Sequence, residues 1–124
     1  SGNPSFAVAE RAAAVGWFPD AISSDIHSGN VNGPVVDLPT TLSKFLMLGM
    51  PLEAVIRAAT SAPAAALKIP GQPGTLGEGA PADVVILEMQ EGEVTFTDSL
   101  RQTRTARRRL AHVTTIRGGE VVAD

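Results

Sequence analysis

At 124 residues, the chain can hold one domain at most, or pieces of two. Its composition, with 44% hydrophobic residues, 19% charged residues and a net charge of −3, is typical of an α/β protein and argues against a dedicated nucleic-acid or membrane binder. There is no cysteine, which excludes disulfides and thiolate metal sites, so any metal must be held by imidazole and carboxylate groups.

The first part of the chain, up to about residue 70, has helical spacing of its apolar residues. Asn3 and Pro4 predict a helix start, and Gly16 predicts its end. Residues 21–24 predict a short buried strand, and a polar, glycine-containing loop follows over residues 25–36. Further helices are expected over residues 39–48 and 51–59, with a short alanine-rich helix over residues 61–67.

The second part, from about Gly71, is punctuated by glycine and rich in valine and threonine, which favours strands. Residues 82–88 predict a strand buried on both faces, because four apolar residues follow one another there. Glu91 and Gly92 predict a turn, and residues 103–116 predict one or two strands. Gly118 and Gly119 predict a hairpin before a last short strand.

Asp25 is the strongest candidate for chemistry, because it lies where a buried strand ends and a polar loop begins. In parallel α/β folds catalytic groups sit at the carboxyl ends of strands. If the backbone stays extended, alternation places Asp25 and His27 on one side, where a carboxylate and an imidazole suit a divalent cation and the water that it activates. An aspartate in this place is also a common turn former or helix cap, so the spacing leaves both roles open.

Three ordered motifs resemble the carboxyl-terminal part of amidohydrolase superfamily enzymes, and most closely the deacetylases related to dihydroorotase. The first comprises residues 22–27 (ISSDIH) and 32–41 (NGPVVDLPTT), which are similar to the eighth-strand region of that superfamily. The second comprises residues 49–56 and 60–64, where Ala62 departs from the asparagine that the family usually has. The third, residues 74–85, is similar to the segment with which these chains re-enter a small β-sandwich.

This resemblance implies an α/β fold: the last strand and helices of a (β/α)8 barrel over residues 1–70, then part of a C-terminal β-sandwich over residues 71–124. It implies that Asp25 contacts a metal ion and is catalytic, taking a proton from the attacking water and passing it to the leaving nitrogen. It also implies that His27, Asn30 and Gly33 belong to a substrate-facing loop. The cofactor implied is a divalent metal, with zinc expected, as one or two ions in the complete enzyme.

The resemblance also shows what the chain lacks. The family's histidine pair on the first barrel strand, its bridging lysine and two further histidines have no counterpart, since His27 and His112 are the only histidines here. A catalytic zinc takes about three protein ligands. We therefore expect an inactive chain that requires the N-terminal portion of the barrel as its partner, together with a small-molecule amide as substrate.

Other features have structural interpretations. His112 lies in a strand pattern, and the arginines between residues 101 and 109 predict a charged sheet edge rather than a nucleic-acid site. No segment has the length of a membrane span or the pattern of a signal peptide, so a cytoplasmic location is expected. An alternative function is a non-catalytic fragment or assembly module, in which exposed barrel edges make a homo-oligomer.

Overall fold

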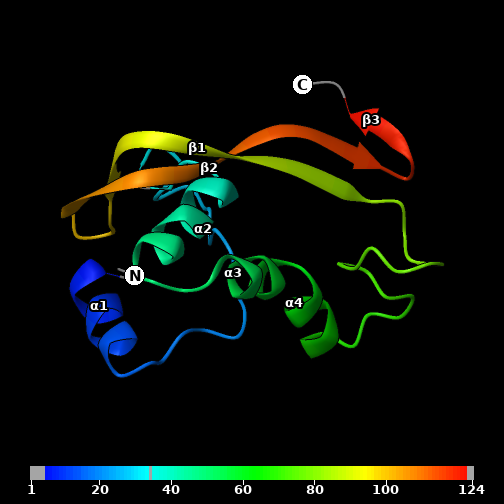
Figure 1. The fold of residues 1–124 in the computed structure, drawn as a ribbon, viewed down its shortest axis with the longest axis horizontal. Coiled ribbons are helices and arrows are strands. Elements are labelled where there is room, and N and C mark those ends of the chain that lie inside the picture. The colour runs from blue at the N-terminus through cyan, green and yellow to red at the C-terminus, as the bar shows by residue number, and fades with distance from the viewer. Residues whose placement is uncertain (1–4, 34, 123–124) are drawn as a thin grey trace.

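The computed structural model describes residues 5–33 and 35–122, which form four helices followed by an antiparallel sheet (Figure 1). The long hairpin of the sheet lies across the helices, and α2 packs directly beneath it. This is an α/β chain with an antiparallel sheet. The elements in chain order are α1 (Phe6–Ala14), α2 (Leu38–Met47), α3 (Leu52–Ala59), α4 (Ser61–Ala66), β1 (Val84–Thr97), β2 (Thr103–Arg117) and β3 (Glu120–Val122).

The helices confirm the sequence predictions to within one or two residues where their ends are described. Asn3 and Pro4, the expected start of α1, lie outside the described residues, and Ser5 is the N-cap, with its hydroxyl accepting from the Val8 N–H. The Asp37 side chain caps α2 by accepting from the Thr40 N–H at 2.7 Å. Such a cap satisfies one of the N–H groups that the first turn of a helix leaves without a partner.

The predicted strand over residues 21–24 is wrong as secondary structure. A strand requires a neighbouring strand, and no strand of the described residues runs beside this segment. Instead, the Ile22 N–H donates to the Ala58 carbonyl at the end of α3, at 2.8 Å. The Ile22 side chain is buried against α2 and α3, so this segment is anchored just before Asp25.

The sheet has the order β1-β2-β3 and is antiparallel throughout. The turn predicted at Glu91 and Gly92 is wrong, because β1 continues through it. Between the pairs Glu91–Arg108 and Val94–Ala106, two residues of β1 oppose one residue of β2, which is a β-bulge. Residues 103–116 form one strand rather than two, and the hairpin at Gly118 and Gly119, both with positive φ, is confirmed.

The core lies between the helices and the inner face of the sheet. Its members are the buried residues Ile22, Leu42, Leu46, Met50, Val55, Ala58 and Leu110. The prediction that residues 82–88 are buried on both faces is wrong, because Val85 is 55% exposed and Ile86 is 45% exposed. Their strand packs on helices with one face only. Among the described residues no helix is long and apolar enough to cross a membrane.

Ser43 joins α2 to the sheet. Its side chain is fully buried, and its hydroxyl donates to the Pro39 carbonyl at 2.7 Å while accepting from the Leu110 N–H of β2 at 2.8 Å. The hydroxyl therefore satisfies a strand N–H that lies in the core. A helix and a strand that are 67 residues apart in the chain are thereby fixed in register.

Ser43→Ala should lower the free energy of unfolding by about 1–3 kcal/mol, because the buried Leu110 N–H would lose its partner. Urea unfolding followed by circular dichroism measures this loss. Ser61→Ala is the matched control, because the Ser61 hydroxyl has no hydrogen bond within the described residues and is partly exposed. Equal stability of the two variants would show that the Ser43 bond does not fix α2 to β2.

Candidate active site around Asp25

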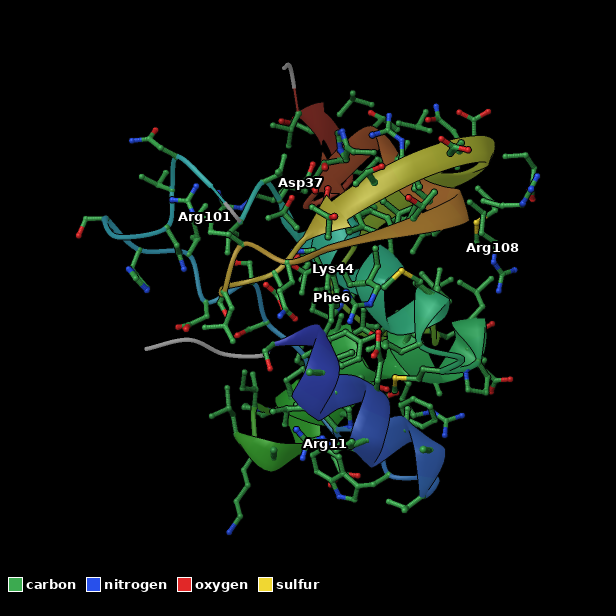
Figure 2. The ribbon with its side chains drawn as sticks, turned by 90° about the vertical axis from the view of Figure 1, so that its left-hand side faces the viewer. Phe6, Arg11, Asp37, Lys44, Arg101 and Arg108 are labelled. Carbon is green, nitrogen blue, oxygen red and sulfur yellow. The ribbon has the colours of Figure 1, made fainter. Side chains whose placement is uncertain are left out.

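A hollow of about 440 Å³, lined by both polar and apolar residues, lies beside the loop that follows Ile22. Of the predicted site residues, Asp25, His27 and Asn30 line the hollow together, whereas Gly33 does not. In Figure 2 this loop extends away from the helices at the left of the view, while Phe6 and Lys44 lie where α1 and α2 approach the sheet. Both of these residues also line the hollow.

Asp25 has an unusual backbone and an uncommitted side chain. Its φ is +49°, in the left-handed region, which costs a residue with a Cβ about 1–2 kcal/mol. The side chain is exposed at the hollow, and its carboxylate makes no hydrogen bond or ion pair with the described residues. The carboxylate is therefore available to a ligand, and it caps no helix within the described structure.

His27 is oriented by its own loop. The Gly29 N–H donates to His27 Nδ1 at 3.0 Å, so Nδ1 must be an acceptor and the neutral ring carries its proton on Nε2. Nε2 is then a hydrogen-bond donor rather than a metal ligand. A Cβ at position 29 would lie 3.0 Å from His27 Cε1, so glycine there lets the backbone approach the ring. This geometry suits a contact with a substrate oxygen.

The Asn30 side chain makes two hydrogen bonds to the backbone of its own loop. Its Oδ1 accepts from the His27 N–H and its Nδ2 donates to the Asp25 carbonyl, both at 2.8 Å. Gly33 donates its N–H to the Asn30 carbonyl at 3.0 Å and has a φ of +113°. The bonds that Asn30 makes thus hold the backbone of Asp25 and His27 in place, while its predicted substrate contact, like that of Gly33, stays a prediction.

Sequence reasoning missed three further residues that line the hollow: Lys44, Asp98 and Ser99. Lys44 lies on α2, and its ammonium donates to the Thr97 carbonyl at 2.7 Å. Burial lowers the pKa of Lys44, and the nearby Asp98 carboxylate only partly offsets this effect. No local pattern reveals these residues, because α2 and the β1–β2 loop meet only in the folded chain.

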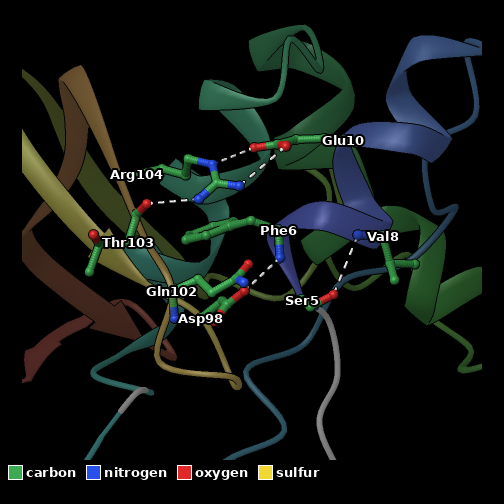
Figure 3. A network of polar contacts seen from close by, with 8 residues as sticks. All are labelled: Ser5, Phe6, Val8, Glu10, Asp98, Gln102, Thr103 and Arg104. Atoms are coloured by element: carbon green, nitrogen blue, oxygen red, sulfur yellow. Dashed lines mark hydrogen bonds and ion pairs between the residues drawn. The ribbon is translucent and has the colours of Figure 1, made fainter.

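Asp98 anchors α1 to the hairpin (Figure 3). Its carboxylate is 3% exposed and accepts from the N–H groups of Phe6 at 2.8 Å, Leu100 at 2.9 Å and Gln102 at 2.8 Å. Arg104 reinforces the joint, since its Nε lies 2.6 Å from Glu10 Oε1 and its guanidinium lies over the Phe6 ring. Burial alone would raise the pKa of Asp98, but these three hydrogen bonds and the charge of Arg104 together lower it.

This lowered pKa predicts acid sensitivity. The carboxylate of Asp98 stabilises the fold fully above its unfolded pKa, near 3.8, and this contribution is lost as the pH falls through the lower folded pKa. Asp98→Asn should lower the free energy of unfolding by about 1.5–3 kcal/mol at pH 7, and its difference from the unchanged chain should shrink in strong acid. Urea unfolding at several pH values tests this. Glu78→Gln, at an exposed position, should show neither effect, and a pH-independent difference for Asp98→Asn would contradict the assignment.

Asp83 and His112, which lie in the sheet half of the chain, are engaged in hydrogen bonds. Asp83 Oδ1 accepts from the Gly118 N–H at 2.8 Å, which ties the start of β1 to the turn between β2 and β3. His112 Nε2 lies 2.8 Å from Thr115 Oγ1. Neither residue lines the hollow of Asp25.

The residues of the hollow supply one part of a metal site. Asp25 has the hard oxygen donor that a divalent cation prefers, and its carboxylate is uncommitted. Within residues 5–33 and 35–122, however, no group of three or more histidine, aspartate or glutamate side chains is placed to hold a metal ion. Asp25 fits such an ion as a single ligand, and the described residues do not complete a site.

Curated relatives cover nearly the whole chain. It is 40% identical over 117 residues to a deacetylase of Enterococcus faecalis, covering 94% of this chain and 31% of that protein. It is 35% identical over 119 residues to a deacetylase of Agrobacterium fabrum, covering 96% and 29% respectively. A deacetylase of Brucella anthropi is 42% identical over 95 residues, covering 77% and 23%. The chain thus spans about a quarter to a third of the length of these relatives.

Two solved structures also match nearly the whole chain. The chain superposes on a crystal structure of an adenine deaminase with a TM-score of 0.90 and 38% identity, covering 97% of this chain and 33% of that one. For a crystal structure of a dihydroorotase the TM-score is 0.86 and the identity 35%, covering 96% and 32%. The model of the Amidohydrolase family matches residues 44–123. The resemblance seen in the sequence motifs is confirmed, and the chain belongs to the Amidohydrolase family.

Proposed function

We propose that this chain is the C-terminal part of a metal-dependent amidohydrolase that hydrolyses a non-peptide C–N amide bond, with deacetylation of a small N-acyl compound as the reaction. The observation that carries the proposal is the uncommitted Asp25 carboxylate at an open hollow, in a chain of this family. The names of the three curated relatives support deacetylation as the reaction class.

The proposed architecture is the end of a (β/α)8 barrel over residues 1–70 and part of a β-sandwich over residues 71–124. Residues 21–24 belong to no helix and have no strand beside them in the described chain, which suits a barrel strand whose neighbours lie elsewhere in a longer protein. Alternation places Val84, Ile86, Ile116 and Val121 on the face of the sheet opposite to Leu87, which packs on the core. An apolar outer face suits a second sheet packed against it.

In the proposed mechanism Asp25 moves the proton. Its carboxylate accepts a proton from the water that attacks the amide carbonyl, and it returns this proton to the nitrogen as the C–N bond breaks. The products are a carboxylic acid and an amine, so atoms and charges balance. His27 Nε2–H would donate to a substrate oxygen, and the Asn30 amide would keep Asp25 and His27 in position.

A divalent metal, with zinc proposed, would lower the pKa of the attacking water, and Asp25 is the ligand that this chain would contribute. The remaining ligands would come from the N-terminal portion of the barrel, which is the partner that this proposal requires. A homo-oligomer and a cytoplasmic location are part of the same proposal.

The test is hydrolysis by a full-length protein that contains this chain. It should release acetate and a free amine from one or more N-acetyl compounds, and turnover should fall on metal chelation and return with added zinc. A panel of N-acetyl amines, N-acetyl amino acids, dihydroorotate and adenine distinguishes deacetylation from the ring chemistries named for the structural neighbours. Turnover of dihydroorotate or adenine alone would reject deacetylation, and metal-independent turnover would reject the metal.

A non-catalytic assembly module is the second candidate, favoured by the exposed apolar side chains of the sheet. Ile86 is 45% exposed and Val121 is 71% exposed, and β1 has no strand on its outer edge among the described residues. Light scattering and zinc titration of this chain separate the candidates. A metal-free oligomer would favour the module, whereas tight stoichiometric zinc in a monomer would contradict the incomplete metal site on which both candidates depend.

A further inference from the structure

The loop that follows Asp25 contains an asparagine directly before a glycine, at Asn32 and Gly33. Asn32 is exposed, and the hydrogen bonds described for this loop do not include its side chain. Asparagine is a thermolabile residue, because the backbone nitrogen of the next residue can attack its side-chain carbonyl carbon. Both reacting groups are therefore present in one exposed pair of residues.

The sequence has three asparagines, and Asn32 is the one suited to this reaction. Asn3 precedes a proline, which has no N–H to lose. Asn30 precedes Val31, whose β-branched side chain crowds the attacking nitrogen. The Asn30 amide is also held at both ends, by hydrogen bonds of 2.8 Å to the His27 N–H and to the backbone of Asp25. Neither obstacle is described for Asn32.

Gly33 leaves room for the attack. A Cβ at this position would meet nothing within 4 Å, so the space beside its backbone is open, and its φ of +113° is one that glycine adopts without strain. Its N–H donates to the Asn30 carbonyl at 3.0 Å. This bond must open before the nitrogen can react, and a hydrogen bond in an exposed loop opens at little cost in free energy.

We propose that Asn32 is a modification site, at which the folded chain deamidates without an enzyme. The Gly33 nitrogen bonds to Asn32 Cγ, the Cγ–Nδ2 bond breaks, and ammonia leaves with the proton of the Gly33 N–H. Water then opens the resulting cyclic imide at either of its carbonyls. Opening at Cγ gives aspartate, whereas opening at the backbone carbonyl gives isoaspartate, in which the main chain runs through the former side chain. This site does not depend on the proposed function.

The modification should affect the candidate site through Asn30. The product has a carboxylate at position 32, and in isoaspartate an additional carbon atom lengthens the main chain before Gly33, which displaces its N–H from the Asn30 carbonyl. The Asn30 side chain in turn holds the His27 N–H and the Asp25 carbonyl. We therefore expect the loop at Asp25 to become less ordered as Asn32 is converted.

The experiment incubates the folded chain in mildly alkaline buffer and follows the conversion of each asparagine by mass spectrometry of proteolytic peptides. A synthetic peptide of residues 28–36 is the unfolded reference. We expect Asn32 in the folded chain to convert at most about tenfold more slowly than in the peptide, because the net contribution of one backbone hydrogen bond is all that protects it. Asn30 should stay unchanged. Slower conversion than this, or equal conversion of Asn30, overturns the proposal.

Asn32→Gln is the blocked variant, because its longer side chain has to close a larger ring, while Gly33 and its turn remain. This variant should show no conversion over the same period, and the same mass change in it would place the reaction elsewhere and overturn the site. Hydrogen exchange of the His27 amide should become faster in the incubated unchanged chain but not in incubated Asn32→Gln. Equal exchange before and after conversion would overturn the link between Asn32 and the loop of Asp25.

Discussion

Asp25→Asn should lower kcat of a full-length enzyme that contains this chain by roughly 10²–10⁴-fold, the range expected when a general acid–base group is lost. Asparagine keeps the shape of the side chain and an oxygen that can still face a metal ion, but it cannot take up a proton from water. The metal content should therefore stay close to that of the unchanged enzyme while turnover falls.

The structure makes this substitution informative because the Asp25 side chain has no structural task within the described residues. The loop is held by the Asp25 carbonyl and by Asn30, not by the carboxylate. Asparagine also tolerates a φ of +49°. A fall in turnover would therefore report on chemistry rather than on folding, which circular dichroism of the variant would verify.

Steady-state kinetics and elemental analysis of the bound metal provide the measurement, and Asp20→Asn provides the control. Asp20 is an exposed aspartate five residues earlier that does not line the hollow. Its variant should keep the turnover of the unchanged enzyme. A rate for Asp25→Asn that matches this control would remove the assignment of Asp25 as the proton carrier.

The helices were predictable because their signals are local. Asp37 and Pro39 start α2, Pro51 precedes α3, and Gly49, with a φ of +96°, separates the two helices. The course of β1 was not predictable in this way. Glu91 and Gly92 have the composition of a turn, but pairing with β2 carries the strand past them as a bulge, and nothing near them in the sequence describes that partner.

Some residues of the candidate site were likewise predictable from local sequence, and others were not. Asp25, His27 and Asn30 lie within six residues, so one motif contains them and one loop brings them together. Lys44 lies on α2, and the carbonyl that it binds is 53 residues later in the chain. Only the packing of α2 under the hairpin brings Lys44 to the same hollow as Asp25.

Gly74→Ala should be among the most destabilising single substitutions in the chain, with a loss of about 2–5 kcal/mol in the free energy of unfolding. A Cβ at this position would lie 2.6 Å from the Thr60 carbonyl carbon and 2.7 Å from its oxygen. These are backbone atoms at the joint between α3 and α4, so they cannot move aside as a flexible side chain could. The φ of +77° adds the cost of a left-handed backbone.

Gly79→Ala separates these two causes. Gly79 has a similar φ of +86°, but a Cβ there would meet nothing within 4 Å. Its variant should lose only the conformational part, about 1–2 kcal/mol. The difference between the two variants in urea unfolding is then the cost of the contact with Thr60. Equal losses would show that the backbone at Gly74 is not closely packed against the α3–α4 joint.

The contact also lies on a path to the candidate site. Thr60 follows Ala59 at the end of α3, and the Ala58 carbonyl accepts the N–H of Ile22, three residues before Asp25. A shift of Thr60 large enough to admit a methyl group should therefore weaken the anchor of the segment that carries Asp25. In the folded Gly74→Ala chain, amide hydrogen exchange at Ile22 should be faster than in Gly79→Ala. Unchanged protection of that amide would confine the effect of Gly74 to the α3–α4 joint.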